Sequence, residues 1–264
     1  MAKKFFVALF CIIIVAIAVV VGWNAYQNQP LIILKDVEQQ ILATNGSEFE
    51  SYADWVWESD RTFVFDVCFL NLFVAGSAKL HIAGMTDFQN QDVVVLEATA
   101  EPEEVFKKIY NGKMVLNAGI GKDSKESLWY REVTITPEKE KTKEILFDPA
   151  KNLATREGKQ YQIPSGTLDP LSVFFALLSK EFTVGKEVVL NLLSKEEIYV
   201  FKVTPKAKTD NIYILSGEVF RQDKSSSHGA RFSMYIYNDK VRVPLLIKVS
   251  TGAGPIYLRL RTVQ

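Results

Sequence analysis

A short and very apolar segment, Leu168–Leu190, most strongly restricts the fold of this chain, because it interrupts a long run of segments typical of β-strands. Pro170 suits the first turn of a helix. Asp169 suits the N-cap, where a carboxylate accepts hydrogen bonds from free backbone N–H groups, and Ser172 offers a second local acceptor. The helix then carries an apolar stripe at the spacing i, i+3, i+4 and i+7, formed by Leu171, Phe174, Phe175 and Leu178.

Such a wide apolar surface on about three turns of helix is stable only if a sheet covers most of it. The surrounding segments alternate apolar and polar residues and are joined by short polar turns, which indicates an antiparallel meander. We therefore predict a mainly β protein: an antiparallel open or half-closed β-barrel that encloses one short helix as its plug. The predicted plug residues are Asp169, Pro170, Leu171, Ser172, Phe174, Phe175 and Leu178.

The strands of this sheet are expected on both sides of the helix. Ala75-Gly76 predicts a turn or a bulge between the first two. Residues 101–110 predict a short surface helix with Pro102 in its first turn, and the charge run Glu138–Glu144 predicts a solvated hairpin loop. The expected strand segments are residues 62–84, 92–100, 113–121, 127–136, 145–150, 187–193, 198–207, 212–220, 231–251 and 253–263.

The start of the chain predicts a transmembrane anchor. The 19 residues Phe5–Trp23 carry no charge, and as a helix they would be roughly 28 Å long, close to the hydrocarbon thickness of about 30 Å. Lys3 and Lys4 precede this span and no charge follows it until Lys35, so we expect the start in the cytoplasm and the remainder exported. An uncleaved anchor in the inner (cytoplasmic) membrane is favoured, because the span exceeds a secretory h-region; a cleaved secretion signal is the alternative.

The chain is thus divided into residues 1–23 (cytoplasmic start and anchor), 24–60 (juxtamembrane linker) and 61–264 (extracytoplasmic, periplasmic β domain). In the linker, Trp55 and Trp57 lie on one side of a possible strand. Their rings suit either the lipid headgroup layer or packing on the edge of the domain.

Charge and cysteine content argue against several classes of protein. The 31 basic and 31 acidic side chains balance, which argues against a nucleic-acid partner, because nucleic-acid binding needs a basic face. Cys68 is the only cysteine beyond the apolar span, so no intrachain disulfide is expected there, and we predict a small buried hydrophobe. Cys11 follows Phe10 rather than a small residue, which predicts a membrane-buried thiol and not a lipoprotein.

No catalytic, cofactor-binding or metal-binding set is recognisable, and we predict that the protein is not an enzyme. His81 on a strand and His228 in a loop lack metal-ligand spacing. Gly119–Lys122 lacks the further residues of a phosphate loop and predicts a hairpin turn, and no Gly-x-Ser-x-Gly occurs. Three acids near apolar residues have structural interpretations, Asp169 as a helix cap and Asp148 and Asp239 as turn-forming side chains. Asp66, within a strand beside Cys68, has no such obvious role, and the simplest interpretation is that it faces water.

Several short motifs, in their order along the chain, resemble the bacterial domain of unknown function 3108 from Phe63 to Leu260. They are Ala75-Gly76, Phe147-Asp148, the DPLS of residues 169–172, Gly185, the YNDKVRVP of residues 237–244 and Gly254. The resemblance implies an exported or anchored envelope protein with an open β half-barrel and without an established activity. Members tend to carry an arginine near the end of the short helix, where this chain has Leu178.

These observations favour a non-catalytic binding or assembly module of the bacterial cell envelope, whose concave apolar face receives a lipid, a glycolipid or a segment of an envelope protein. The alternatives are a purely structural envelope protein and a hydrolase that acts on envelope polysaccharide. The hydrolase alternative requires two carboxylates about 5–10 Å apart in a cleft. No cofactor is expected.

Overall fold

The fold was analysed in a computed structural model of the chain. The structure describes residues 60–69, 73–108, 111–194, 196–209, 212–223, 230–238, 242–251 and 254–264. The predicted anchor and nearly all of the predicted linker lie outside these residues, as do Cys11, His228 and Asp239. Within the described part of the chain, no helix has the length and apolar character needed to cross a membrane.

Strands dominate the described residues, which confirms the prediction of a mainly β protein. The strands are β1 (Thr62–Phe69), β2 (Phe73–Phe88), β3 (Gln91–Pro102), β4 (Lys113–Gly121), β5 (Ser127–Ile135), β6 (Glu140–Asp148), β7 (Leu153–Arg156), β8 (Lys159–Gln162), β9 (Thr167–Leu168), β10 (Val188–Ser194), β11 (Glu197–Lys208), β12 (Ile212–Arg221), β13 (Ala230–Asn238), β14 (Arg242–Thr251) and β15 (Gly254–Val263). The helical segments are α4 (Glu104–Lys107), the 3-10 turn η1 (Pro149–Lys151) and α5 (Ser172–Leu178).

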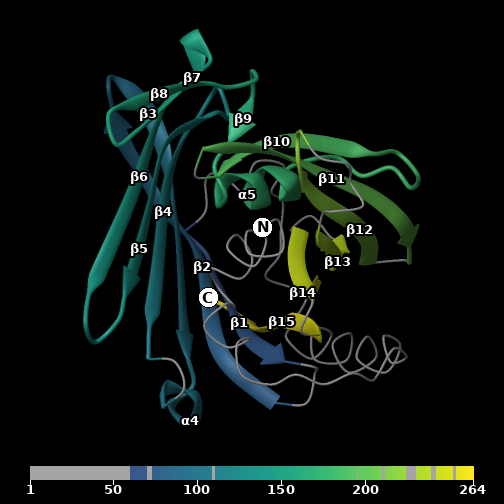
Figure 1. Cartoon of the computed structure of the whole chain (residues 1–264). Coiled ribbons are helices and arrows are strands. Elements are labelled where there is room, and N and C mark those ends of the chain that lie inside the picture. The colour runs from purple at the N-terminus through teal and green to yellow at the C-terminus, as the bar shows by residue number, and fades with distance from the viewer. Residues whose placement is uncertain are drawn as a thin grey trace.

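All fifteen strands belong to one sheet, in the order β8-β7-β6-β5-β4-β3-β2-β1-β15-β14-β13-β12-β11-β10-β9. The first and last strands, β1 and β15, pair antiparallel at its centre, with Phe63 opposite Val263 and Val67 opposite Leu258. They join a first arm, β2–β8, to a second arm, β9–β14 (Figure 1). The outer edges of the arms, β8 and β9, are not bonded to each other, so the sheet is open, as predicted.

One strand pair departs from the antiparallel prediction. β9 pairs with β10 in parallel, with Thr167 beside Asn191 and Leu168 beside Leu192. The connection between these two strands contains α5, and a crossover that places a helix over a sheet returns the chain in the same direction. The prediction of a wholly antiparallel sheet is therefore wrong at this two-residue pair.

The inward face of the sheet and α5 form one hydrophobic cluster. All seven residues of α5 are buried, and the helix lies between the two arms, where it contacts β4 and β10 (Figure 1). Phe63 and Phe65 on β1 and Phe201 on β11 belong to the same cluster. A helix of this length is marginal alone, so its stability comes from burial, at about 1.5–3 kcal/mol for each large apolar side chain.

Ala75-Gly76 is a bulge rather than a turn. β2 is continuous from Phe73, and the register with β1 shifts there, because Val67 is opposite Gly76 while Cys68 is opposite Val74. A Cβ atom on Gly76 would lie 2.6 Å from the carbonyl oxygen of Glu101 on β3. Glycine thus permits the close approach of β3 to the bulged strand.

Three local predictions on the first arm need correction. The short surface helix predicted in residues 101–110 is present as α4, Glu104–Lys107, with no buried residue. Pro102, however, ends β3 instead of starting that helix, because it still pairs with Gly76 of β2. Most of Glu138–Glu144 lies in β6, where the charges form cross-strand ion pairs such as Arg131–Glu144 at 3.3 Å. Gly119–Gly121 ends β4 and the turn follows it, because Ile120 between the glycines is fully buried in the core.

Candidate functional site

A fully buried carboxylate attaches α5 to the first arm. Asp169 is 0% exposed, and its Oδ1 accepts hydrogen bonds from the backbone N–H groups of Leu171 at 2.8 Å and Ser172 at 2.9 Å. Its Oδ2 accepts from the hydroxyls of Ser127 on β5, at 2.7 Å, and of Ser172. Asp169 therefore accepts from buried backbone N–H groups at the start of α5, as expected of a cap, but the helix begins only at Ser172 with Leu171 at its N-cap. The prediction that Pro170 lies in the first turn is thus wrong, and the Ser172 hydroxyl donates rather than accepts.

The hydrogen bonds of Asp169 hold the fold together rather than forming a binding site. Burial raises the pKa of Asp169, while the hydrogen bonds from Ser172, Ser127 and Leu171 lower it in part. Tyr130, on the same inward face of β5, is also buried, and burial together with the nearby Glu132 raises its pKa well above the usual value. Glu132 is in turn ion-paired with Lys143 of β6. Each carboxylate of this group already has hydrogen-bond or ionic partners.

A guanidinium lies at the other end of α5. Arg242, at the start of β14, donates from Nη1 to the carbonyl oxygen of Leu178 at 3.0 Å, and it lies 5.0 Å from the ring centroid of Phe182. Burial lowers the pKa of Arg242. Leu178 itself is 1% exposed, and β14 supplies a cation at this end of the helix.

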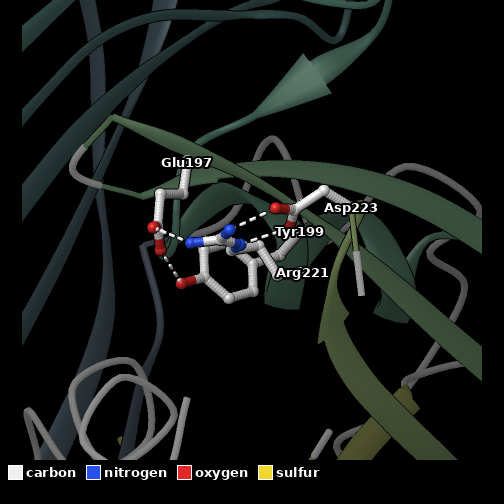
Figure 2. Close-up of polar contacts among 4 residues, drawn as sticks. All are labelled: Glu197, Tyr199, Arg221 and Asp223. Carbon is white, nitrogen blue, oxygen red and sulfur yellow. Dashed lines mark hydrogen bonds and ion pairs between the residues drawn. The ribbon is translucent and has the colours of Figure 1, made fainter. Parts of the chain in front are cut away.

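A second charged group stands on the inward face of the second arm. This inner charged cluster consists of Glu197, Tyr199, Arg221 and Asp223 (Figure 2). The guanidinium of Arg221 donates to the carboxylates of both Glu197 and Asp223, and the hydroxyl of Tyr199 donates to Glu197 at 2.5 Å. Burial, followed by the hydrogen bond to Glu197, raises the pKa of Tyr199.

The inner charged cluster lies next to apolar side chains on the same face of β10, β11 and β12. Tyr199 is opposite Arg221 on one side and Leu192 on the other, and two residues further along β11 the same positions are held by Phe201, Val219 and Leu190. Charged side chains on an inward face are costly unless they are paired or reach water. Here both conditions hold, because the side chains of Arg221, Glu197 and Asp223 are 31%, 39% and 57% exposed.

The arrangement is therefore an amphipathic wall, apolar along β10–β12 and charged at one end. We did not predict these four residues. A signal was present, because Glu197, Tyr199 and Arg221 occupy the inward positions of strands whose other inward residues are apolar. Recognising it requires the strand pairing that brings Glu197 and Arg221 together across 24 residues of sequence.

The remaining candidate residues lie apart from both clusters. Asp66 does not simply face water, because it accepts from Arg261 Nε at 2.7 Å and lies 3.7 Å from Arg259. Asp148 accepts from the backbone N–H of Lys151 at 3.2 Å and so forms the predicted turn. Cys68 is buried, and burial raises the pKa of its thiol.

His81 has partners on the outer face of the sheet. Its Nδ1 lies 2.9 Å from the hydroxyl of Thr62 and its Nε2 lies 3.5 Å from Asp60. Among the described residues, no group of three or more His, Cys, Asp or Glu side chains is placed to hold a metal ion.

Comparison with known proteins agrees with this architecture. Residues 64–261 match the family described as "Protein of unknown function (DUF3108)". A search of curated proteins gave no match. Among solved structures, the fold is similar to the beta-barrel-like protein of domain of unknown function DUF1849 from Brucella abortus, with a TM-score of 0.51 and 10% sequence identity over 78% of this chain and 98% of that one. At this identity the likeness concerns the fold alone.

Proposed function

Because the chain belongs to the DUF3108 family of proteins of unknown function, we propose its role from its geometry. The protein is a membrane-anchored, extracytoplasmic binding module of the bacterial cell envelope. It binds the apolar chain of an amphiphile, a lipid or a glycolipid, along the inward face of the open sheet. The anchor is residues 1–23, and the binding domain is residues 61–264.

The observation that carries this proposal is the amphipathic wall of the second arm. An amphiphile needs an apolar surface for its chain and a polar, solvated place for its headgroup. The half-buried Leu190, with the buried Phe201 opposite it, offers the first, and the partly exposed Arg221 with its two carboxylates offers the second. Because the edge strands β8 and β9 are not hydrogen-bonded to each other, the two arms can separate there without breaking any strand pairing.

The same cluster argues against the hydrolase alternative. Glycoside hydrolysis uses one carboxyl group as a proton donor and a second as a base or nucleophile, across a space that holds the sugar. Glu197 and Asp223 instead converge on one guanidinium that lies between them (Figure 2). We therefore propose binding without catalysis.

The proposal is tested by photocrosslinking with the full-length protein in its membrane. Cells are supplied with a diazirine-bearing fatty acid, which they incorporate into lipids, and adducts are mapped by mass spectrometry after irradiation. In the wild type we expect adducts on inward-facing residues of β10–β12. Leu190→Glu places a charge on the half-buried apolar wall, so we expect about tenfold fewer adducts there.

Val189→Glu is the matched control, because Val189 is the next residue on β10 but is 50% exposed on the outer face. It should keep the wild-type yield. If adducts in the wild type are confined to residues 1–23, the proposal is wrong, because such adducts would report only the lipid around the anchor. Equal yields in Leu190→Glu and the wild type would also contradict it.

A further inference from the structure

The outer face of the second arm carries an apolar patch at one end. Strand alternation places Leu246 on the face opposite the inward-facing Ile247, and pairing continues that outer face to Tyr235 on β13 and Ile214 on β12. The next pairs toward the same end are Val243 with Tyr237 and Tyr237 with Ile212. We call these six residues the outer patch: Ile212, Ile214, Tyr235, Tyr237, Val243 and Leu246.

Most of the outer patch is sheltered from water and belongs to the same contiguous set of buried apolar side chains as the core, although strand alternation places it on the face opposite the inward-facing Ile247. Ile212, Val243, Leu246 and Tyr235 are 2%, 4%, 5% and 9% exposed. Burial also raises the pKa of Tyr235. At the other end of the same strands, the outward-facing Arg231 is exposed. Within the described part of the chain, the principal contacts of α4 are with β3 and those of α5 with β4 and β10, so neither helix accounts for this shelter.

Cations border the outer patch. Arg259 is opposite Leu246 on β15, and Arg261 lies beside it, with Asp66 as the shared acidic partner. Lys248 on β14 lies 5.8 Å from the ring centroid of Tyr257 on the same face. Three basic side chains with one acid leave this border net positive, which favours an acidic covering segment.

A segment of suitable chemistry lies immediately before β1. Residues 47–60 contain five acids, namely Glu48, Glu50, Asp54, Glu58 and Asp60, and no basic residue. They also contain four aromatic residues, namely Phe49, Tyr52, Trp55 and Trp57. β1 and β14 both pair antiparallel with β15, so the chain enters β1 at the end of the sheet where the outer patch lies.

The segment is long enough to reach the patch. β13 lies three strand positions from β1, which is about 14 Å at the usual strand spacing. Thirteen residues can span up to about 45 Å when extended. We infer that residues 47–59 cover the outer patch, with their aromatic side chains on its apolar residues and their acids beside Arg259, Arg261 and Lys248. The domain is thereby held against the segment that leads to its anchor.

Thiol labelling of the full-length protein tests this inference. In a background of Cys11→Ser and Cys68→Ala, a single Tyr237→Cys reports on the patch, and Arg231→Cys is the matched control on the exposed end of the same face of β13. We expect a maleimide to label Tyr237→Cys about tenfold more slowly than Arg231→Cys. Adding Trp55→Ser and Trp57→Ser should remove that difference and leave Arg231→Cys unchanged.

A second variant distinguishes loss of the covering segment from a general loss of folding. Glu50→Lys with Glu58→Lys retains the aromatic residues but reverses the charge beside the basic border, so labelling of Tyr237→Cys should accelerate, most strongly at low salt. The inference is overturned if neither set of substitutions changes the labelling rate. It is also overturned if protection of Tyr237→Cys is lost on dilution, because a second copy of the chain would then be the cover.

Discussion

Asp169 shows how burial of one residue determines its protonation and its effect on stability. Burial raises its pKa above the ordinary value of 3.8, against the opposing effect of its hydrogen bonds. A carboxyl group whose pKa is higher in the folded than in the unfolded state binds more protons when folded. Its contribution to stability is complete below the unfolded-state pKa and is lost as the pH rises through the folded-state pKa.

Asp169→Asn should remove this pH dependence. The variant cannot ionise, yet its amide oxygen can still accept from the N–H groups of Leu171 and Ser172. We expect the free energy of unfolding of the wild type to fall relative to that of Asp169→Asn as the pH rises from about 4 to about 8. Denaturant unfolding at a series of pH values measures the difference.

Asp148 provides a control of opposite sign. The side-chain hydrogen bond from Lys151 lowers the pKa of Asp148, so its contribution is present above the unfolded-state pKa and is lost as the pH falls. Relative to Asp148→Asn, the wild type should therefore lose stability on acidification. If the curves of the wild type and Asp169→Asn run parallel, burial does not govern the pKa of Asp169.

These residues also mark what sequence alone can predict. The capping contacts of Asp169 lie two and three residues away and follow from local pattern. Its bond to Ser127, 42 residues earlier, does not. Asp66 was misjudged for the same reason, because its partner Arg261 is 195 residues away and depends on the pairing of the two terminal strands.

At the scale of the element, α5 is held by enclosure rather than by its own helical tendency. Phe175 is fully buried and its ring lies 5.6 Å from that of Phe174 in an edge-on arrangement. Phe175→Ala should lower the free energy of unfolding by about 3–5 kcal/mol, because it leaves a cavity between the helix and the sheet. Val184→Ala, at a side chain 50% exposed beyond the helix, should change it by less than about 0.5 kcal/mol.

Denaturant unfolding of the two variants decides this point, since equal losses would mean that α5 is not enclosed more tightly than the loop after it.

The length of a strand determines whether it can be predicted from the sequence. The long strands β4, β5 and β10–β15 agree with predicted segments to within about one residue at their outer ends, because alternation is visible over seven or more residues, although β13 and β14 were expected as one segment. β7, β8 and β9, with four, four and two residues, were missed because so short a run carries no readable period.

At the scale of the whole molecule, the two arms meet in two different ways. The β1–β15 ladder joins them at the centre and is extended by backbone bonds between Thr62 and Gln264 at 2.8 and 2.9 Å. At the outer edges, β8 and β9 are consecutive in the chain but do not pair. Hydrophobic alternation predicted an open barrel, but it contains no information about which strands become its edges.

The outer edges are bridged only weakly by side chains. Arg156 on β7 lies 4.0 Å from Glu196 in the turn between β10 and β11, and Glu196 also contributes, after burial, to a raised pKa of Tyr161 on β8. Because the two charges are 4.0 Å apart and the Glu196 side chain is 51% exposed, the pair is worth less than about 1 kcal/mol. Removing it should leave global stability nearly unchanged but should favour local opening at the unpaired edges.

Glu196→Ala should therefore increase amide hydrogen exchange in β8 and β9 without changing exchange in the β1–β15 ladder, which hydrogen-exchange mass spectrometry of the full-length protein resolves. Glu187→Ala is the matched control, because the Glu187–Lys202 pair at 3.5 Å joins two parts of the same arm. If Glu187→Ala accelerates exchange in β8 equally, or if Glu196→Ala accelerates it at β1 as well, the arms do not part at this edge. An amphiphile would then have to enter at the inner charged cluster, along the exposed side chains of Glu197 and Arg221.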